Sequence, residues 1–514
     1  MYPVWLEWEG LREKYEIQKS REDHIISESL PIGTKTVEIF RNDSYNISGI
    51  VKGKFEKYEE LDVLKQKSSP LGTFVEPNNI TISDISAHYS ILGLMGNLTY
   101  AFDNKFEYRF SAYSVKREFD NSEKISWLTE WFLNGPNNPL VFSSSTEYEL
   151  VKKYKRIRKI SENYKHLSTD LKTNLTKDNT HFEKLDKWSV KSFNYSLIGY
   201  ENEESETSYF IIHQVPDELG PEWSENIGIE FREEWKIPND DERTKIREIV
   251  SFILGRQLLN IGHTKYDKNG NYIEDFVSDN DLPSAIDLKK LCNQSYDKTP
   301  IKINPLDPKT SLEHVLKQLI PPYLKNRDEL KLNHMLWRYW LAMALNFESR
   351  LTLLSSGLEL LFKYWYKSTK SKSKGVYLNK NIFDDVLENQ FNSIGMILNG
   401  QKYSDRMIRR MQNAYQMGVN ERIRNFFDEI QLDVGIVEEK ALRIRNKPVH
   451  GSIFGSKESE ELWKLTEAYI VLINRMILKI LGFSGKYIDY YNPDYPERTL
   501  ERPIIKYLNQ GNDR

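Results

Sequence analysis

"RDELKLNHMLWRYWLAMALNFESRLTLLSSGLELLFKYWYKS" (residues 327–368) decides the fold class of the C-terminal half, because its apolar residues recur at helical spacing. A helix with one face buried in a core typically carries such a stripe. The stripe repeats every three or four residues and consists of Leu351, Leu354, Leu358, Leu361, Phe362 and Trp365. We therefore predict one or two helices over these residues.

The same period continues towards the C-terminus and predicts a helical bundle. Further helices are expected at about 381–398, 401–415, 419–430 and 435–446. The last helix starts at Ser456, which can cap it, and stops before Gly482. Arg475 and Lys479 lie near its end, where positive charge interacts favourably with the helix dipole.

The N-terminal half alternates with a period of two, which is typical of strands. "TKTVEIF" and "YNISGIV" (34–51) flank a turn of Asn and Asp, and "NLTYAF" and "FEYRFSAYSV" (97–115) repeat the arrangement. Both pairs predict β-hairpins. Asn269-Gly270 is the strongest hairpin signal in the chain. Further strands are expected at 191–200, 208–215 and 227–235.

Two helices are predicted within this β-rich half. The first is "NSEKISWLTEWFLNG" (121–135), with an apolar face of Trp127, Leu128, Trp131 and Phe132. The second starts at Asp240 or Asp241 and ends at Gly255.

The domain organisation follows from these periods and from a change in composition. Prolines scattered among polar residues at 278–325 indicate a connecting region. We predict an α+β protein with a β-rich N-terminal region at 1–277, a helical bundle at 326–484 and a C-terminal tail at 485–514.

The composition limits the location and the partners. The 72 basic and 75 acidic residues give a net charge of -3, so any nucleic-acid site must be a local patch. Cys292 is the single cysteine, which excludes an internal disulfide and favours a reducing compartment. Because no signal peptide and no membrane-spanning run is evident, we expect a soluble, cytoplasmic protein.

Common catalytic signatures are absent from the sequence. It contains no phosphate-binding GxxxxGK[ST] loop, no dinucleotide-binding GxGxxG, no HExxH, no CxxC and no GxSxG. We therefore expect no cofactor and no metal ion.

The stretch "ALRIRNKPVHGSIFG" (441–455) is the strongest candidate for a functional site. Pro448 cannot donate within a helix and disfavours helical geometry at Lys447, so the helix that carries Arg445 should end there. His450 can then turn towards the same cleft as Arg445. Arg443 and Arg445 are about 200° apart on a helix, so that only one of them can face His450.

Arginine and histidine together suit RNA cleavage without a metal ion. The 2′-hydroxyl must lose a proton and the 5′-oxygen must gain one, which are tasks for a group that titrates near neutral pH. The added charge on the phosphorus centre favours a forked cation. The residues alone also allow another interpretation, in which Arg445 and His450 only cap a helix.

"RNKPVH" (445–450) resembles the R-[polar]-x3-H motif of HEPN domains, which are helical bundles. "ESRLTLLSSGLELLFKYW" (348–365) is similar to the earlier core helix of these domains, with Glu359 at the position of their acidic residue. The N-terminal half, especially "REIVSFILGRQLLNIGHTKYD" (247–267), is similar to the region that precedes the HEPN domain in ApeA-type bacterial anti-phage proteins.

The resemblance implies a metal-independent endoribonuclease in which two copies of the motif form one composite cleft. His450 would act as general base or acid, and Arg445 would bind the scissile phosphate. Asn446 would bond the phosphate or orient His450, and Glu359 would hold Arg445. It further implies a homodimer or a higher even-numbered oligomer formed through the HEPN bundle.

Two basic clusters are candidates for RNA contacts. The first begins at the end of the core helix and continues into the Ser-rich stretch that follows; it comprises Lys363, Lys367, Lys370, Lys372 and Lys374. The second comprises Lys402, Arg406, Arg409 and Arg410. Solvated loops are the alternative interpretation of both clusters.

The resemblance also implies a role in abortive infection, with RNA attacked in an infected cell, tRNA as a candidate substrate and a phage-derived trigger. Two other function classes remain open: a non-catalytic HEPN module for nucleotide or RNA binding or for dimerisation, and an interaction protein in which "RNKPVH" only caps a helix.

Overall fold

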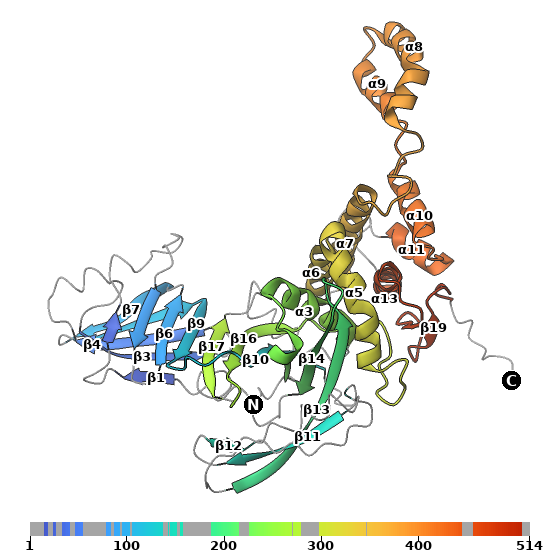
Figure 1. Cartoon of the computed structure of the whole chain (residues 1–514). Helices are drawn as coiled ribbons and strands as arrows, with labels where there is room; N and C mark the ends of the chain where they lie inside the picture. Colours follow the sequence, from blue (N-terminus) through green and yellow to red (C-terminus); the bar gives the residue numbers. More distant parts are fainter. Residues whose placement is uncertain are drawn as a thin grey trace. The chain divides into compact units, whose positions relative to one another are not determined.

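A computed structural model gives the structure of the chain. It describes residues 15–18, 24–26, 33–41, 47–54, 79–83, 87–92, 95–102, 105–136, 142, 144–151, 155–157, 187–214, 226–269, 271–278, 298–345, 347–444 and 456–505. The chain divides into two compact units, one of residues 1–299 and 303–321 and one of residues 300–302 and 322–514. The predicted α+β class is confirmed: antiparallel sheets come first, and a helical region follows (Figure 1).

The first unit contains a five-stranded antiparallel sheet that includes both predicted hairpins. β3 pairs with β4, and β8 pairs with both β4 and β7. In spatial order its strands are β1 (Tyr15–Gln18), β3 (Thr34–Arg41), β4 (Ile47–Lys54), β8 (Lys105–Ala112) and β7 (Met95–Phe102).

A twelve-stranded antiparallel sheet forms the larger part of this unit. In spatial order its strands are β12 (Lys155–Ile157), β11 (Ser144–Val151), β13 (Lys187–Glu201), β14 (Thr207–Gln214), β15 (Asn226–Arg232), β10 (Trp127–Leu133), β16 (Leu259–Tyr266), β17 (Tyr272–Ser278), β9 (Ser114–Phe119), β6 (Ala87–Leu92), β5 (Asn79–Ser83) and β2 (His24–Ile26). The predicted strands at 191–200, 208–215 and 227–235 correspond to β13, β14 and β15.

The two sheets share a hydrophobic core. Val51 of β4 and Phe110 of β8 pack in one cluster with Ile91 of β6, Val115 of β9 and Val277 of β17. Alternate residues of β8 are buried and exposed, as the period of two predicts for a strand with one covered face.

The predicted helix over 121–135 is wrong, because Trp127–Leu133 form strand β10 in the middle of the large sheet. Trp127 and Trp131 point to one face and Leu128 and Phe132 to the other, and all four are buried. Apolar residues on both faces remove the alternation that distinguishes a strand from a helix.

The second predicted helix is confirmed as α3 (Asp240–Leu254), which follows a short 3₁₀ helix, η4 (Glu233–Trp235). Asn239 caps α3 by accepting from the amide of Glu242, and Gly255 ends it with a left-handed φ of 70°. The Asn-Gly hairpin is also confirmed, since β16 pairs with β17 across residues 267–271.

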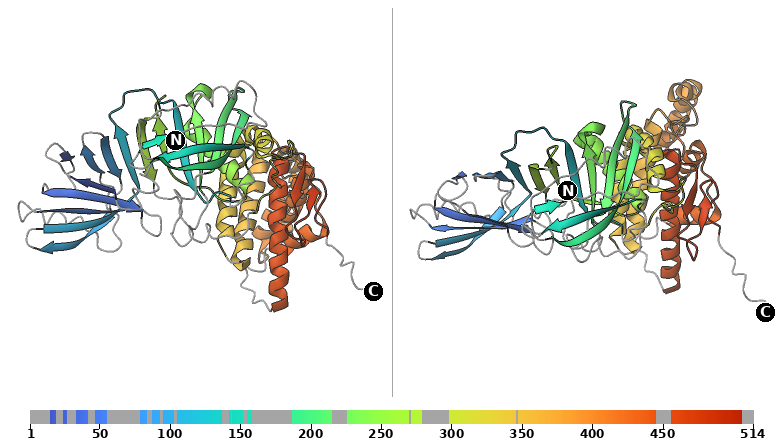
Figure 2. Two further views of the ribbon diagram at one scale, coloured as in Figure 1. Left: turned by 90° about the horizontal axis from the view of Figure 1, so that it is seen from below. Right: turned by 60° about the horizontal axis from the view of Figure 1, so that its bottom comes forward.

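The second unit contains the helical bundle. Its core contains α6 (Leu332–Met343), α7 (Phe347–Lys367) and α13 (Ser456–Ile480), and α13 packs against α7 and α11 (Figure 2). α10 (Val419–Glu429) and α11 (Ile436–Ile444) complete the bundle. The apolar stripe of α7 is buried from Leu351 to Trp365, as predicted.

The described parts of the predicted connecting region and tail, residues 298–325 and 485–505, contain regular elements. α5 (Leu312–Leu330) begins inside the 278–325 range and runs through Pro321 and Pro322, which the breaker rule for proline did not anticipate. After α13, β18 (Lys486–Ile488) and β19 (Glu497–Thr499) form a small antiparallel pair. Tyr487 and Leu500 are fully buried, so burial of aromatic and aliphatic side chains holds residues 485–505.

A helical hairpin of α8 (Lys380–Leu398) and α9 (Ser404–Gln412) projects from the bundle (Figure 1). A narrow neck joins it to the bundle: Tyr377 donates its amide to Tyr415, and Met417 donates its amide to Gly375. α8 and α9 are described in full and contain no buried residue.

Among the helices that the structure describes, none combines the length and the hydrophobicity that crossing a membrane requires.

Candidate functional site

The predicted catalytic motif follows directly after helix α11. α11 ends at Ile444, and Arg445, Asn446 and His450 lie outside the described residues. The structure therefore shows how the helix that leads to the motif is held, and what surrounds its last turn.

A buried ion pair fixes α11 to α13. Glu438 of α11 and Arg475 of α13 are both fully buried and are bonded to each other. The Arg475 guanidinium also donates to the carbonyl oxygens of Leu500, at 2.8 Å, and Asp433, at 3.0 Å. The dipole interaction predicted for Arg475 is therefore not its main role, because its charge is matched inside the core by a carboxylate and two carbonyls.

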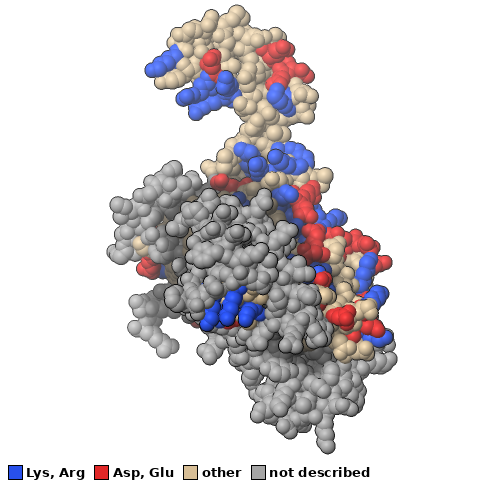
Figure 3. All heavy atoms as spheres, turned by 90° about the vertical axis from the view of Figure 1, so that its left-hand side faces the viewer, with Lys and Arg blue, Asp and Glu red and all other residues tan. Residues whose placement is uncertain are grey.

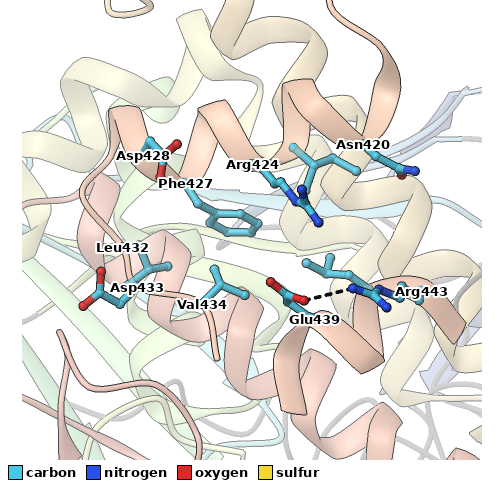
Figure 4. Close-up of a pocket in the computed structure, with 11 residues that line it drawn as sticks. Asn420, Arg424, Phe427, Asp428, Leu432, Asp433, Val434, Glu439 and Arg443 are labelled. Carbon is cyan, nitrogen blue, oxygen red and sulfur yellow. Dashed lines mark hydrogen bonds and ion pairs between the residues drawn. The ribbon is translucent and has the colours of Figure 1, made fainter. Parts of the chain in front are cut away.

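A cleft of about 760 Å³ lies between α10 and α11 (Figure 4). Its apolar floor includes Ile423 and Phe427 of α10 and Leu432 of the connecting segment, all of which are buried. The polar side chains that line the cleft lie at its rim.

The charges at the rim are divided between the two ends of the cleft. Arg424 and Arg443 lie at one end with Asn420, and Asp428 and Asp433 lie at the other (Figure 4). The basic end is the end at which α11 stops, because Arg443 belongs to its last turn. The guanidinium groups of Arg424 and Arg443 could therefore bind a phosphate group at that end.

Glu439 limits the charge at the basic end. Its carboxylate accepts from the Arg443 guanidinium at 3.1 Å, while the Arg443 side chain stays 74% exposed. Ion pairs of such exposure contribute little to stability, so Arg443 can exchange Glu439 for an anionic ligand at low cost. The sequence analysis did not single out Arg424. The sequence feature that could have identified it is a cation placed among apolar residues on a short amphipathic helix.

The first predicted basic cluster lies on and after the end of α7. Lys363, Lys367, Lys372 and Lys374 are exposed, and Lys370 is half-buried. Ser368 and Ser371 are buried, so the backbone of the stretch 368–375 is anchored to the bundle while Lys372 and Lys374 are open to solvent.

Glu429 of α10 holds residues 368–375, which we call the lysine loop, through several hydrogen bonds. Its carboxylate accepts from the indole of Trp365 at 2.6 Å, from the amide of Ser373 at 2.9 Å and from the hydroxyl of Ser371 at 3.3 Å. The side-chain amide of Asn425 adds a fourth bond at 3.1 Å. One carboxylate thus ties the loop to the helix whose other side lines the cleft.

These bonds determine the charge state of Glu429. Burial by itself raises the pKa of the carboxyl group, but the hydrogen bonds from Trp365, Ser373 and Ser371 outweigh it and lower the pKa to about 2. Glu429 is therefore ionised throughout the physiological range.

The remaining predicted residues lie on separate elements. Glu359 lies on α7, one residue after buried Leu358, with an exposed side chain. The second basic cluster lies on the hairpin, where Lys402 and Arg406 lie over the ring of Tyr403 at 5.1 and 5.6 Å from its centroid. Figure 3 shows Lys and Arg side chains gathered on the hairpin and again at its base. The second cluster also includes Arg409 and Arg410, both exposed.

Among the described side chains, no cluster of three or more His, Cys, Asp or Glu residues could hold a metal ion. Comparison of the chain with protein-family models, with curated proteins and with solved structures found no match.

Proposed function

We propose that this protein is a metal-independent endoribonuclease of the HEPN type that acts in anti-phage defence. The observation that carries the proposal is the sequence Arg445-Asn446-x-x-x-His450 immediately after α11. α11 is held by a buried ion pair and contributes its last turn to a cleft with a basic end. The resemblance to HEPN domains supports the same assignment.

The reaction needs one proton removed and one proton supplied. A base takes the proton of the 2′-hydroxyl, whose oxygen forms a bond to phosphorus, and the bond from phosphorus to the 5′-oxygen breaks as that oxygen is protonated. The products are a 2′,3′-cyclic phosphate and a 5′-hydroxyl. His450 serves as the base or the acid, Arg445 stabilises the charge on phosphorus and Asn446 bonds the phosphate or orients His450. Glu359 holds Arg445.

The substrate path uses cations on both sides of α10. Arg424 and Arg443 at the basic end of the cleft bind phosphates next to the cleavage site. The lysine loop, including Lys370, Lys372 and Lys374, contacts the backbone further along, and Lys363 and Lys367 extend the path over α7. RNA is the class of substrate, with tRNA as the candidate, and the active assembly is a homodimer or a higher even-numbered oligomer that joins two motifs.

Cleavage of tRNA by the purified chain tests this function. The wild-type protein should produce 2′,3′-cyclic phosphate ends in the presence of EDTA. His450→Ala and Arg445→Ala should each reduce the rate by at least about 100-fold, since each removes general acid–base catalysis or phosphate stabilisation. Lys447→Ala removes a cation from the same segment and should retain activity.

Mixing the two inactive variants tests the composite cleft. If one cleft uses residues of both copies, Arg445→Ala mixed with His450→Ala should recover part of the activity. Cleavage that survives in His450→Ala, or that is lost with EDTA, contradicts the mechanism. RNA binding with no cleavage by the wild type supports the non-catalytic HEPN module instead.

The proposed setting is the bacterial cytoplasm during infection. The β-rich unit would sense a phage-derived trigger and so restrain a toxic activity until infection. Growth arrest on expression of the wild-type chain with the trigger, but not of His450→Ala, is the expected outcome in cells.

A further inference from the structure

Helix α8 of the projecting hairpin carries two separate apolar stripes. Phe383, Leu387 and Phe391 are half-buried and face the hairpin's own interior, where the Phe383 ring lies 5.7 Å from Phe391 and 5.6 Å from Tyr415. These residues close the hairpin, as helix pairs do with the face that they share.

The second stripe lies on another side of α8 and is open to solvent. Ile382, Val386, Met396 and Ile397 are 52, 63, 74 and 76% exposed. At about 100° per residue they fall on one side of the helix, roughly 130° from the inner stripe. We call these four residues the outer stripe. The four residues form two apolar pairs on that side, with Asn389 and Ser393 between them. Large apolar side chains exposed on one side of a helix mark an interaction surface.

Most acidic and basic side chains of the hairpin lie at opposite ends of α8. Asp384, Asp385 and Glu388 lie in the first half of the helix, and residues 389–398 carry no charge. Lys402 follows directly after the second half, and α9 adds Arg406, Arg409 and Arg410 with one acid, Asp405. In the described part of the chain Asp384 bonds Lys380 within α8, and no ion pair connects α8 with α9.

This arrangement selects a second copy of the hairpin as the partner. When two α8 helices pack antiparallel about a two-fold axis, Asp385, which lies about 75° from the outer stripe, flanks the contact on the side of the other helix's basic end. Ile382 and Val386 of one helix then meet Met396 and Ile397 of its copy, and Asn389 lies near the axis. A parallel arrangement would instead place like charges together.

We propose that the outer stripe of α8 joins two copies of this chain in an antiparallel hairpin-to-hairpin contact. The contact is independent of RNA cleavage. It is distinct from the association of two catalytic motifs, so the two contacts together would build a tetramer, which is one of the even-numbered assemblies expected. An RNA partner would use the cations of α9 and leave the outer stripe exposed.

Sedimentation velocity of the full chain tests the contact. Ile397→Glu should weaken self-association by about 100-fold, because the symmetry removes two buried isoleucines for each substitution. Asn392→Glu is the matched control: it adds the same charge at an exposed position of α8 outside the outer stripe and should weaken the association far less than Ile397→Glu, because no apolar contact is lost.

Cross-linking tests the register without altering the apolar stripe. In a Cys292→Ser background, Asn389→Cys should form an intermolecular disulfide on oxidation, whereas Asn392→Cys should not. Equal association of wild type and Ile397→Glu, or cross-linking at 392 in place of 389, would overturn the proposal. An Ile397→Glu variant that loses RNA affinity but keeps its association would assign the hairpin to RNA.

Discussion

Replacing Glu429 with glutamine removes the negative charge that ties the lysine loop to α10. Glu429 accepts four hydrogen bonds, from Trp365, Ser371, Ser373 and Asn425. A glutamine keeps one accepting oxygen and presents an amide group in place of the other. At least one donor, such as the indole of Trp365, then faces a second donor and loses its partner.

Two independent arguments give the size of the effect. A buried donor without a partner costs about 1–3 kcal/mol. The pKa of Glu429, lowered to about 2, corresponds to roughly 3 kcal/mol of interaction with the charged form, which solvent screening of the half-exposed group reduces to about 1–2 kcal/mol. We expect Glu429→Gln to destabilise the loop by about 2 kcal/mol.

Hydrogen exchange of the full chain measures this local change. The amide of Ser373 should exchange roughly 30-fold faster in Glu429→Gln at neutral pH, because exchange reports the free energy of local opening. Asp428→Asn is the control, since it removes a neighbouring exposed charge of the same helix. Unchanged exchange of residues 368–375 in Glu429→Gln would refute the account of the loop.

The pH dependence of the same variant provides a second test. The folded-state pKa of Glu429 lies below its unfolded value, so its stabilisation is complete above about pH 4.5 and is lost as the pH falls towards 2. The difference in exchange between wild type and Glu429→Gln should therefore shrink over this range. If the difference in exchange stays constant with pH, the negative charge of Glu429 is not the source of the stabilisation.

Two further substitutions test the packing of the helical unit and of the β-rich unit separately. Arg475→Met leaves the Glu438 carboxylate buried without its cation and should destabilise the helical unit by about 3–5 kcal/mol. Urea unfolding followed at 222 nm measures this loss. The double variant Arg475→Met/Glu438→Gln should recover part of it, because the uncompensated charge is gone. Gly255→Ala places a Cβ atom 2.4 Å from the amide nitrogen of Thr299 at a φ of 70°, and should lower the thermal stability of the β-rich unit by at least about 1–3 kcal/mol; an unchanged melting temperature would contradict that geometry.

Local pattern was sufficient where an element has one covered face. The stripe from Leu351 to Trp365 predicts α7, and the alternation in β8 predicts a strand, because in both elements the contrast between buried and exposed sides appears in the sequence. Asn269-Gly270 predicts the β16–β17 hairpin because the turn itself needs those residues.

Where both faces of an element are covered, the sequence shows no contrast between a buried and an exposed side. Trp127, Leu128, Trp131 and Phe132 are compatible with a helix and with a strand, and only their neighbours in the sheet, β15 and β16, decide between them. The prolines of α5 illustrate the same limit, since local preference argued against a helix that packing nevertheless forms.

For the candidate site, the sequence by itself determined which residues follow α11 and that Pro448 separates Arg445 from His450. Only the tertiary structure decided what holds that helix and what lies beside it. The Glu438–Arg475 pair, the anchoring of the lysine loop by Glu429 and the meeting of Arg424 with Arg443 each join residues far apart in the chain. Local periodicity carries no information on such pairs, because their energy comes from burial and charge that arise only when distant helices meet.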